Sequence, residues 1–204
     1  MDHMPGGAGE RPFAELAAGE CPPYAELLLA LSAEFGAVDT AWARERLDDD
    51  SRALFGVASL SPLARADSLA AVLGGELGLR PTTGAGAAGL LLDRVLCRRE
   101  GHPALLAAIG AELARRAGVP AGVYASPSRW FVGLGHGDDL VVLDAALDDA
   151  AGEPPHELRP ACAHELAFCL LCGLATAYTQ AGRDADARHA GRLRLALPVV
   201  PRGA

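Results

Sequence analysis

Residues 90–103 read Leu-Leu-Leu-Asp-Arg-Val-Leu-Cys-Arg-Arg-Glu-Gly-His-Pro, and their last part, Arg99 to Pro103, separates two predicted helices. Gly101 can adopt the left-handed conformation that commonly ends a helix, and Pro103 has the fixed φ that suits the first turn of the next one. The second helix reaches Gly118 and repeats apolar side chains at Leu105, Leu106, Ile109, Leu113 and Ala117. This helical spacing predicts that one face of the second helix is buried.

Three short Val-rich segments follow the second helix and predict a small antiparallel sheet. They span residues 119–126, 128–134 and 140–144. Pro127 separates the first two segments, and Gly-His-Gly-Asp at 135–138 separates the last two. Such turn residues between apolar runs are typical of a β-meander. A buried helix followed by three antiparallel strands indicates an α+β fold.

The ordered motifs of this region resemble the transglutaminase-like superfamily, and within it a bacterial branch of invasion-regulator-type proteins. The motifs are Val95-Leu96, Arg98-Arg99, Gly101-His102-Pro103, Ala114-Arg115-Arg116-Ala117-Gly118, Pro127-Ser128-Arg129-Trp130-Phe131-Val132 and Leu140-Val141-Val142-Leu143-Asp144. The resemblance implies a transglutaminase-like (papain-like) core with N-terminal helices, a small antiparallel sheet and a tetratricopeptide-like C-terminal helical hairpin. It extends over roughly residues 24–197.

The same resemblance implies that the usual catalytic residues are not kept. The superfamily's nucleophilic Cys, at the start of the buried helix, falls at Pro103, and its His falls at Arg129. Only the acidic position, Asp144, keeps its type. Thiol catalysis needs a thiolate, a base that shuttles protons near neutral pH and a group that orients the base. Pro supplies none of these, and Arg does not release its proton in proteins. We therefore expect a catalytically degenerate protein.

Composition gives the expected organisation of the 204-residue chain. Residues 1–20 are expected to form a disordered tail because their first part lacks an apolar core. Residues 21–152 are expected to form the transglutaminase-like domain with its N-terminal helices. Residues 153–204 are expected to form a helical hairpin packed on that domain, with its first helix starting near Arg159.

Charge and composition also restrict location and partners. The formal net charge of −8 argues against nucleic acid and anionic membranes as partners. No apolar run is long enough to cross a membrane, and the first residues lead us to expect no signal peptide. The odd number of Cys residues favours a reducing cytoplasm over a disulfide framework. All 18 basic residues are Arg, which is typical of a GC-rich bacterial genome and excludes lysine Schiff-base chemistry.

Four side chains are candidates for a ligand-binding cleft: His102, Arg129, Trp130 and Asp144. His102 lies at a helix start beside the lost Cys position, where it is either a surface turn residue or a base that contacts a ligand. Arg129 and Asp144 are expected to be neighbours on adjacent strands and to form a charge-assisted pair. That pair is either a structural tie that fills the old catalytic space or an anion-recognition site.

Cys97 is the only thiol near this region of the sequence. It could act as a relocated nucleophile, but its place beside Leu96 in an apolar helix favours an inert thiol.

Two further clusters suggest metal ligands, and we interpret both as structural. Cys162, Glu165, Cys169 and Cys172 share one face of a predicted helix, with His164 beside them, but that face lacks a fourth ligand. The acidic run Asp48–Asp50 interrupts a predicted helix that is capped at Asp39-Thr40, and it has no His or Cys near it in sequence. A solvated helix turn or loop is the simpler interpretation of the run. No metal and no cofactor are expected.

The sequence leaves three functions open. The first is a cytoplasmic accessory or binding protein for a peptide, protein or small molecule. The second is an enzyme of a specialised biosynthetic pathway that uses His102, Arg129 and Asp144 in non-thiol chemistry. The third is a thiol hydrolase that uses Cys97. A deep pocket into which both His102 and Arg129 point would favour the second function, and Cys97 exposed at that pocket would favour the third.

Overall fold

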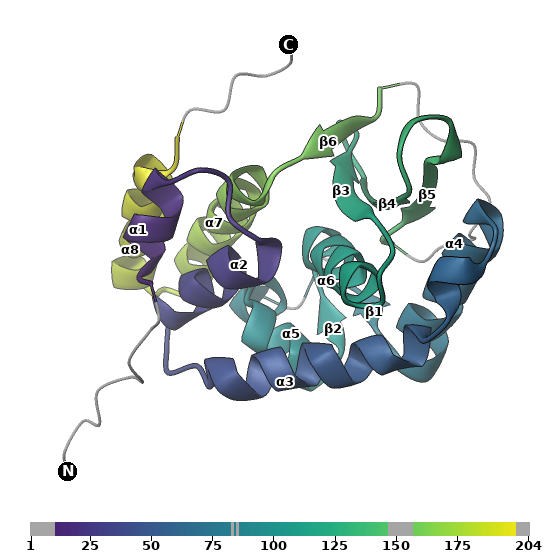
Figure 1. The fold of residues 1–204 in the computed structure, drawn as a ribbon. Coiled ribbons are helices and arrows are strands. Elements are labelled where there is room, and N and C mark those ends of the chain that lie inside the picture. The colour runs from purple at the N-terminus through teal and green to yellow at the C-terminus, as the bar shows by residue number, and fades with distance from the viewer. Residues whose placement is uncertain (1–10, 83, 85, 147–156, 199–204) are drawn as a thin grey trace.

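The computed structural model describes residues 11–82, 84, 86–146 and 157–198 (Figure 1). The elements, in chain order, are α1 (Phe13–Ala18), α2 (Tyr24–Ala33), α3 (Thr40–Ser51), η1 (Arg52–Leu54), η2 (Val57–Ser59), α4 (Pro62–Ala70), η3 (Ala71–Glu76), β1 (Arg80–Pro81), η4 (Gly86–Leu90), α5 (Leu92–Arg98), β2 (Glu100–Gly101), α6 (Pro103–Arg116), β3 (Ala121–Ala125), β4 (Trp130–Leu134), η5 (Gly137–Asp139), β5 (Val141–Asp144), β6 (Arg159–Ala161), α7 (Ala163–Gln180) and α8 (Asp184–Ala196). Helices and a small sheet therefore combine in one α+β arrangement, as the sequence predicts.

Helix α6 lies at the centre of the fold, between the sheet and helices α2 and α3 (Figure 1). It begins where the sequence predicts, with His102 as the N-cap and Pro103 in the first turn. Leu105 and Leu113 are fully buried. Gly110 lets the helix approach the sheet closely, because a Cβ there would lie 2.8 Å from Cγ2 of Val132.

The main sheet has the strand order β5-β4-β3-β6, and every neighbouring pair is antiparallel. The first three strands confirm the predicted meander. The fourth, β6, corrects the prediction, because residues near Arg159 form an edge strand and helix α7 begins only at Ala163. Pro160 lacks an N–H, and such a residue is tolerated at a sheet edge. The face that carries Val132 meets α6, as the close approach of Gly110 shows.

Two buried polar side chains tie helix α2 to this core. The Tyr24 hydroxyl donates to the carbonyl oxygen of Ala161 at 2.9 Å and accepts from the backbone N–H of Val123 at 3.1 Å. It thereby joins strands β3 and β6 through a residue far away in sequence. Glu112 of α6 accepts a hydrogen bond from the backbone N–H of Ala25 at 3.2 Å, which satisfies a free donor at the start of α2.

The break before α6 differs in detail from its prediction. The left-handed residue that ends α5 is Arg99, with φ 61°, and not Gly101. Gly101 lies in strand β2, which pairs in parallel with β1. Its lack of a side chain is required by packing, since a Cβ there would lie 2.6 Å from Cγ2 of Val95.

The acidic run lies on a helix turn with Asp48 and Asp49 exposed, as the sequence indicates, but it does not interrupt the helix and Asp50 is buried, which corrects that part of the interpretation. Helix α3 continues through it to Ser51, and Asp39 caps the helix by accepting from the N–H of Trp42 at 2.9 Å. The Asp50 side chain is only 4% exposed and forms a two-point ion pair with Arg99, at 2.8 and 3.2 Å. This pair joins α3 to the end of α5.

The two ends of the described chain pack against each other. Helices α7 and α8 form the predicted hairpin, and the ring of Phe35, which follows α2, stacks on that of Tyr178 in α7 at a centroid distance of 5.3 Å. Part of the expected disordered tail is ordered, because residues 13–18 form α1 with Phe13 buried. The predicted boundary at 152/153 lies outside the described residues.

No helix in the described part of the chain is long and apolar enough to cross a membrane.

A candidate binding cavity at the start of helix α6

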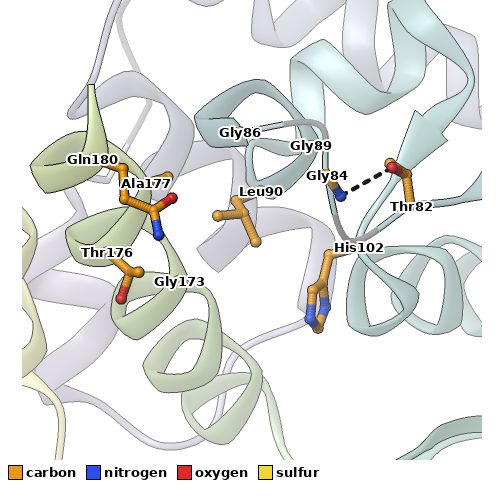
Figure 2. A pocket seen from close by; sticks show the side chains of 10 residues that line it. All are labelled: Thr82, Gly84, Gly86, Gly89, Leu90, His102, Gly173, Thr176, Ala177 and Gln180. Carbon is orange, nitrogen blue, oxygen red and sulfur yellow. Dashed lines mark hydrogen bonds between the residues drawn. The ribbon is translucent and has the colours of Figure 1, made fainter.

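A cavity of about 310 Å³ lies between helix α7 and the segment that leads to α6. Figure 2 shows α7 on one side, His102 on the other and Leu90 between them. The lining residues are Thr82, Gly84, Gly86, Gly89, Leu90, His102, Gly173, Thr176, Ala177 and Gln180. The space is large enough for part of a small ligand or a peptide side chain.

Close packing of two elements forms the base of this cavity. Gly173 of α7 lies against Leu90, and a Cβ at Gly173 would lie 3.0 Å from the Leu90 Cδ1. Because a larger residue at Gly173 would push the two elements apart, the position of α7 depends on this glycine. The opposite wall is fixed by a hydrogen bond of 2.8 Å from the N–H of His102 to the carbonyl oxygen of Gly89.

His102 is held in one orientation at the cavity wall. Its Nδ1 accepts a hydrogen bond from the backbone N–H of Ala104 at 3.2 Å, so the imidazole acts as the N-cap of α6. Burial lowers the pKa of His102 below its usual value of 6.5. The positive end of the helix dipole also disfavours a charged imidazole at this position. His102 is therefore neutral at physiological pH, with Nδ1 committed to the helix and Nε2 free to donate.

The chemistry of the cavity is polar and uncharged. Its polar side chains are Thr82, His102, Thr176 and Gln180. No Asp, Glu, Arg or Cys is found among the described residues that line it. Such a lining can donate hydrogen bonds to an amide or hydroxyl group and accept them, but it offers no counter-charge for an ionic ligand.

Of the four residues expected to line a cleft, only His102 lines this cavity. Arg129 and Asp144 form the predicted ion pair. In the sheet register Asp144 pairs with Phe131, and the neighbouring Val132 faces α6. The side chains of Asp144 and Phe131 therefore lie on the face that points away from α6, and Arg129, two residues before Phe131, lies on the same face. The Arg129 side chain is 46% exposed, so the pair is partly open to solvent and does not fill a space against α6. Trp130 is half-buried and packs against the core.

The thiols lie elsewhere. Cys97 is exposed on α5, and it is not among the residues that line the cavity. Cys162 precedes α7 as its N-cap, so it does not continue the helical row of Cys169 and Cys172. Burial raises the pKa of Cys169 to about 11, which keeps this thiol protonated and unreactive.

Sequence reasoning missed the residues of the other wall. Thr176 and Gln180 lie one turn apart on α7, and Thr82 lies almost a hundred positions earlier in the chain. These residues are close together because α7 packs on η4, and no local sequence motif predicts this packing. The four-residue spacing of Thr176 and Gln180 places them on one helix face, but it does not show which element that face meets.

Comparison with known proteins gives one match. A family model described as "Transglutaminase-like superfamily" matches residues 37–149, from just before α3 to just beyond β5. No curated protein and no solved structure matches the chain. The matched region is more than half of the chain and contains the start of α6, both partners of the Arg129–Asp144 pair and most of the sheet. The chain therefore belongs to the transglutaminase-like superfamily.

Proposed function

We propose that this protein is a catalytically degenerate member of its superfamily that binds a neutral, hydrogen-bonding ligand in the His102 cavity. The observation that carries the proposal is the composition of the cavity at the start of α6. Pro103 occupies the position at which the family resemblance puts a nucleophile. The neighbouring His102 uses Nδ1 to cap the helix, and the lining side chains have neither a thiol nor a carboxylate.

The enzyme that would use His102, Arg129 and Asp144 together receives less support. An acid–base site needs its groups within hydrogen-bond reach of one substrate. His102 lines the cavity, whereas Arg129 and Asp144 neutralise each other on the outer face of the sheet. A thiol hydrolase is also less favoured, because the exposed Cys97 does not line the cavity.

The cavity favours an amide-bearing ligand, such as a peptide side chain or a small molecule with carboxamide groups. Gln180, Thr176 and His102 can pair with both the donor and the acceptor of an amide. A charged ligand would lose its hydration without gaining a partner of opposite charge, which is costly. We place this binding protein in the cytoplasm, as an accessory to other proteins, and its five free Cys residues agree with a reducing compartment.

The test is a binding experiment with the full chain. N-acetylglutaminamide serves as the neutral amide probe and N-acetylglutamate as its charged counterpart. We expect the neutral probe to shift the imidazole NMR signals of His102 and the charged probe to leave them unchanged.

Two variants of α7 sharpen this test. Ala177→Leu places a larger side chain at the cavity wall and should abolish the response, whereas Thr179→Leu, at an exposed position of the same helix, should retain it. A second assay measures the incorporation of a labelled primary amine into a glutamine-containing protein. Incorporation that disappears in His102→Asn would show that the site is catalytic and would overturn the proposal.

A further inference from the structure

A cluster of three soft ligand residues lies apart from the His102 cavity, at the start of helix α7. Cys21 precedes α2, Cys162 precedes α7, and His164 lies in the first turn of α7. One ligand atom of each residue lies within 4.8 Å of the ligand atoms of the other two. The cluster thus joins the N-terminal segment to the C-terminal hairpin, although its members are separated by some 140 positions in sequence.

We propose that Cys21, Cys162 and His164 bind zinc or a similar divalent metal ion that prefers thiolate ligands. The fourth coordination position of the ion is open to solvent. Two thiolates and one imidazole are ligands that zinc prefers. With zinc–sulfur bonds of about 2.3 Å and zinc–nitrogen bonds of about 2.0–2.1 Å, tetrahedral geometry separates donors by about 3.5–3.8 Å. The three donors therefore need to approach one another by only about 1 Å to form the site.

The backbone around the cluster is arranged to stabilise negative sulfur atoms. The N–H of Ala163 donates to the Cys21 sulfur at 3.2 Å. At the Cys162 sulfur, the nearby backbone N–H groups of Glu165 and His164 act to lower the pKa of the thiol. These donors belong to the first turn of an 18-residue helix, whose positive end favours thiolates.

Burial opposes that effect at one of the thiols. Desolvation raises the pKa of Cys162, although the nearby backbone N–H groups oppose the rise. Without a cation the thiol keeps its proton, and a bound divalent ion would displace the protons of both thiols, as metal–thiolate binding requires. Two thiolates and one divalent ion give the site no net charge, which suits its partly buried position.

His164 is buried, and its ring has a partner outside the cluster. Nε2 lies 3.4 Å from the carbonyl oxygen of Leu16 in α1. When Nε2 carries the proton and points to this oxygen, Nδ1 has the free electron pair that a metal needs. A backbone carbonyl that fixes the second ring nitrogen in this way is common around metal-bound His.

The neighbouring polar groups are engaged with other partners, so the fourth ligand comes from solvent. Both carboxylate oxygens of Glu165 pair with Arg159. The hydroxyl of Tyr24, the nearest phenol, is held by Ala161 and Val123. Cys21 is exposed, so water can reach the open side of the site.

The test is a titration of the reduced, metal-free full chain with cobalt(II), followed by competition with zinc. Thiolate-to-cobalt charge-transfer absorption should appear and saturate at about one ion per chain, and zinc should remove it. Cys21→Ser and Cys162→Ser should each weaken binding at least about tenfold, because even the loss of an outer-shell partner weakens metal sites by that much. Cys97→Ser, at an exposed thiol outside the cluster, is the matched control and should bind like the parent.

Three results would overturn the proposal. The first is the absence of charge-transfer absorption in the reduced chain. The second is equal binding by Cys21→Ser and the parent, and since Cys21 is exposed, loss of folding should not obscure this variant. The third is a combination of two results: the reduced chain takes up no metal, and the air-oxidised chain contains a Cys21–Cys162 disulfide. His164→Asn should broaden or shift the cobalt spectrum, and an unchanged spectrum would remove His164 from the site.

Discussion

Asp144, the last residue of strand β5, pairs with Arg129, which precedes strand β4, on the face of the sheet that points away from α6. Only 7% of the Asp144 side chain is exposed, whereas 46% of the Arg129 side chain is. Asp144 also accepts a hydrogen bond from the N–H of Ala146 at 2.8 Å, and the Arg129 guanidinium lies 5.3 Å from the ring centre of Phe131. The pair therefore ties the end of β5 to the start of β4 and leaves the cavity at His102 untouched.

We expect Arg129→Met to lower the free energy of unfolding by about 1–2 kcal/mol. The pair is partly exposed, so its contribution to stability should lie between that of a surface ion pair and that of a buried one. Asp144→Asn should cost about as much or more, since it leaves Arg129 without its anion. The double variant should cost less than the sum of the two. A double-mutant cycle by urea denaturation measures this coupling, and strictly additive costs would show that the two residues stabilise the fold independently.

The sequence predicts the central helix and three of the strands because each is encoded locally. Helix α6 has Pro103 at its start and a helical repeat of apolar residues, and strands β3 to β5 are Val-rich runs between turn residues. Strand β6 lacks such a signal, since Arg159–Ala161 is short and contains a proline. It is a strand only because β3 offers it an edge and Tyr24 bridges the two.

The predicted Arg129–Asp144 contact is correct, but the sequence does not show which face of the sheet carries the pair. Strand alternation shows which residues share a face, and only tertiary packing shows which face meets the helix. The close contact between Gly110 of α6 and Val132 determines which face of the sheet meets the helix. A single glycine inside a helical pattern does not indicate which residue it will contact. The cavity wall on α7 escaped prediction for the same reason.

The buried ion pair between Asp50 and Arg99 gives a second prediction. Only 17% of the Arg99 side chain is exposed, so Asp50→Asn leaves a largely buried guanidinium without its main partner. We expect a loss of about 3–5 kcal/mol in the free energy of unfolding. The matched control is Asp49→Asn, which breaks the exposed pair with Arg52 and should cost at most about 1 kcal/mol. Equal costs for the two variants, read by denaturant unfolding, would contradict the prediction.

Thiol reactivity provides a third prediction. Burial raises the pKa of Cys169 to about 11, with smaller contributions from Cys172 and Glu165, whereas Cys97 is exposed on α5. Iodoacetamide at mildly alkaline pH should therefore modify Cys97 well before Cys169, because only accessible thiolates react. Peptide mapping by mass spectrometry gives the order of labelling, and chain unfolded in urea provides the control in which the difference should vanish. Labelling of Cys169 as fast as Cys97 in the folded chain would show that α7 opens.

The last prediction concerns the pH dependence of stability through His102. Its folded-state pKa lies below the usual 6.5 because of burial, and protonation of Nδ1 would also remove the hydrogen bond to the N–H of Ala104. Below about pH 6.5 the unfolded chain binds a proton that the folded chain does not, so stability falls as the pH is lowered towards the folded-state pKa. Above about pH 6.5 this contribution is fully present.

His102→Asn keeps a side-chain acceptor for the N-cap and does not titrate, so it should reduce the loss of unfolding free energy between about pH 7.5 and about pH 5. Urea denaturation at several pH values measures the change, with His136→Asn as the control for an exposed imidazole. A pH dependence unchanged in His102→Asn would mean that this imidazole is charged in the folded protein or freely hydrated, and the neutral donor assigned to the cavity would be wrong.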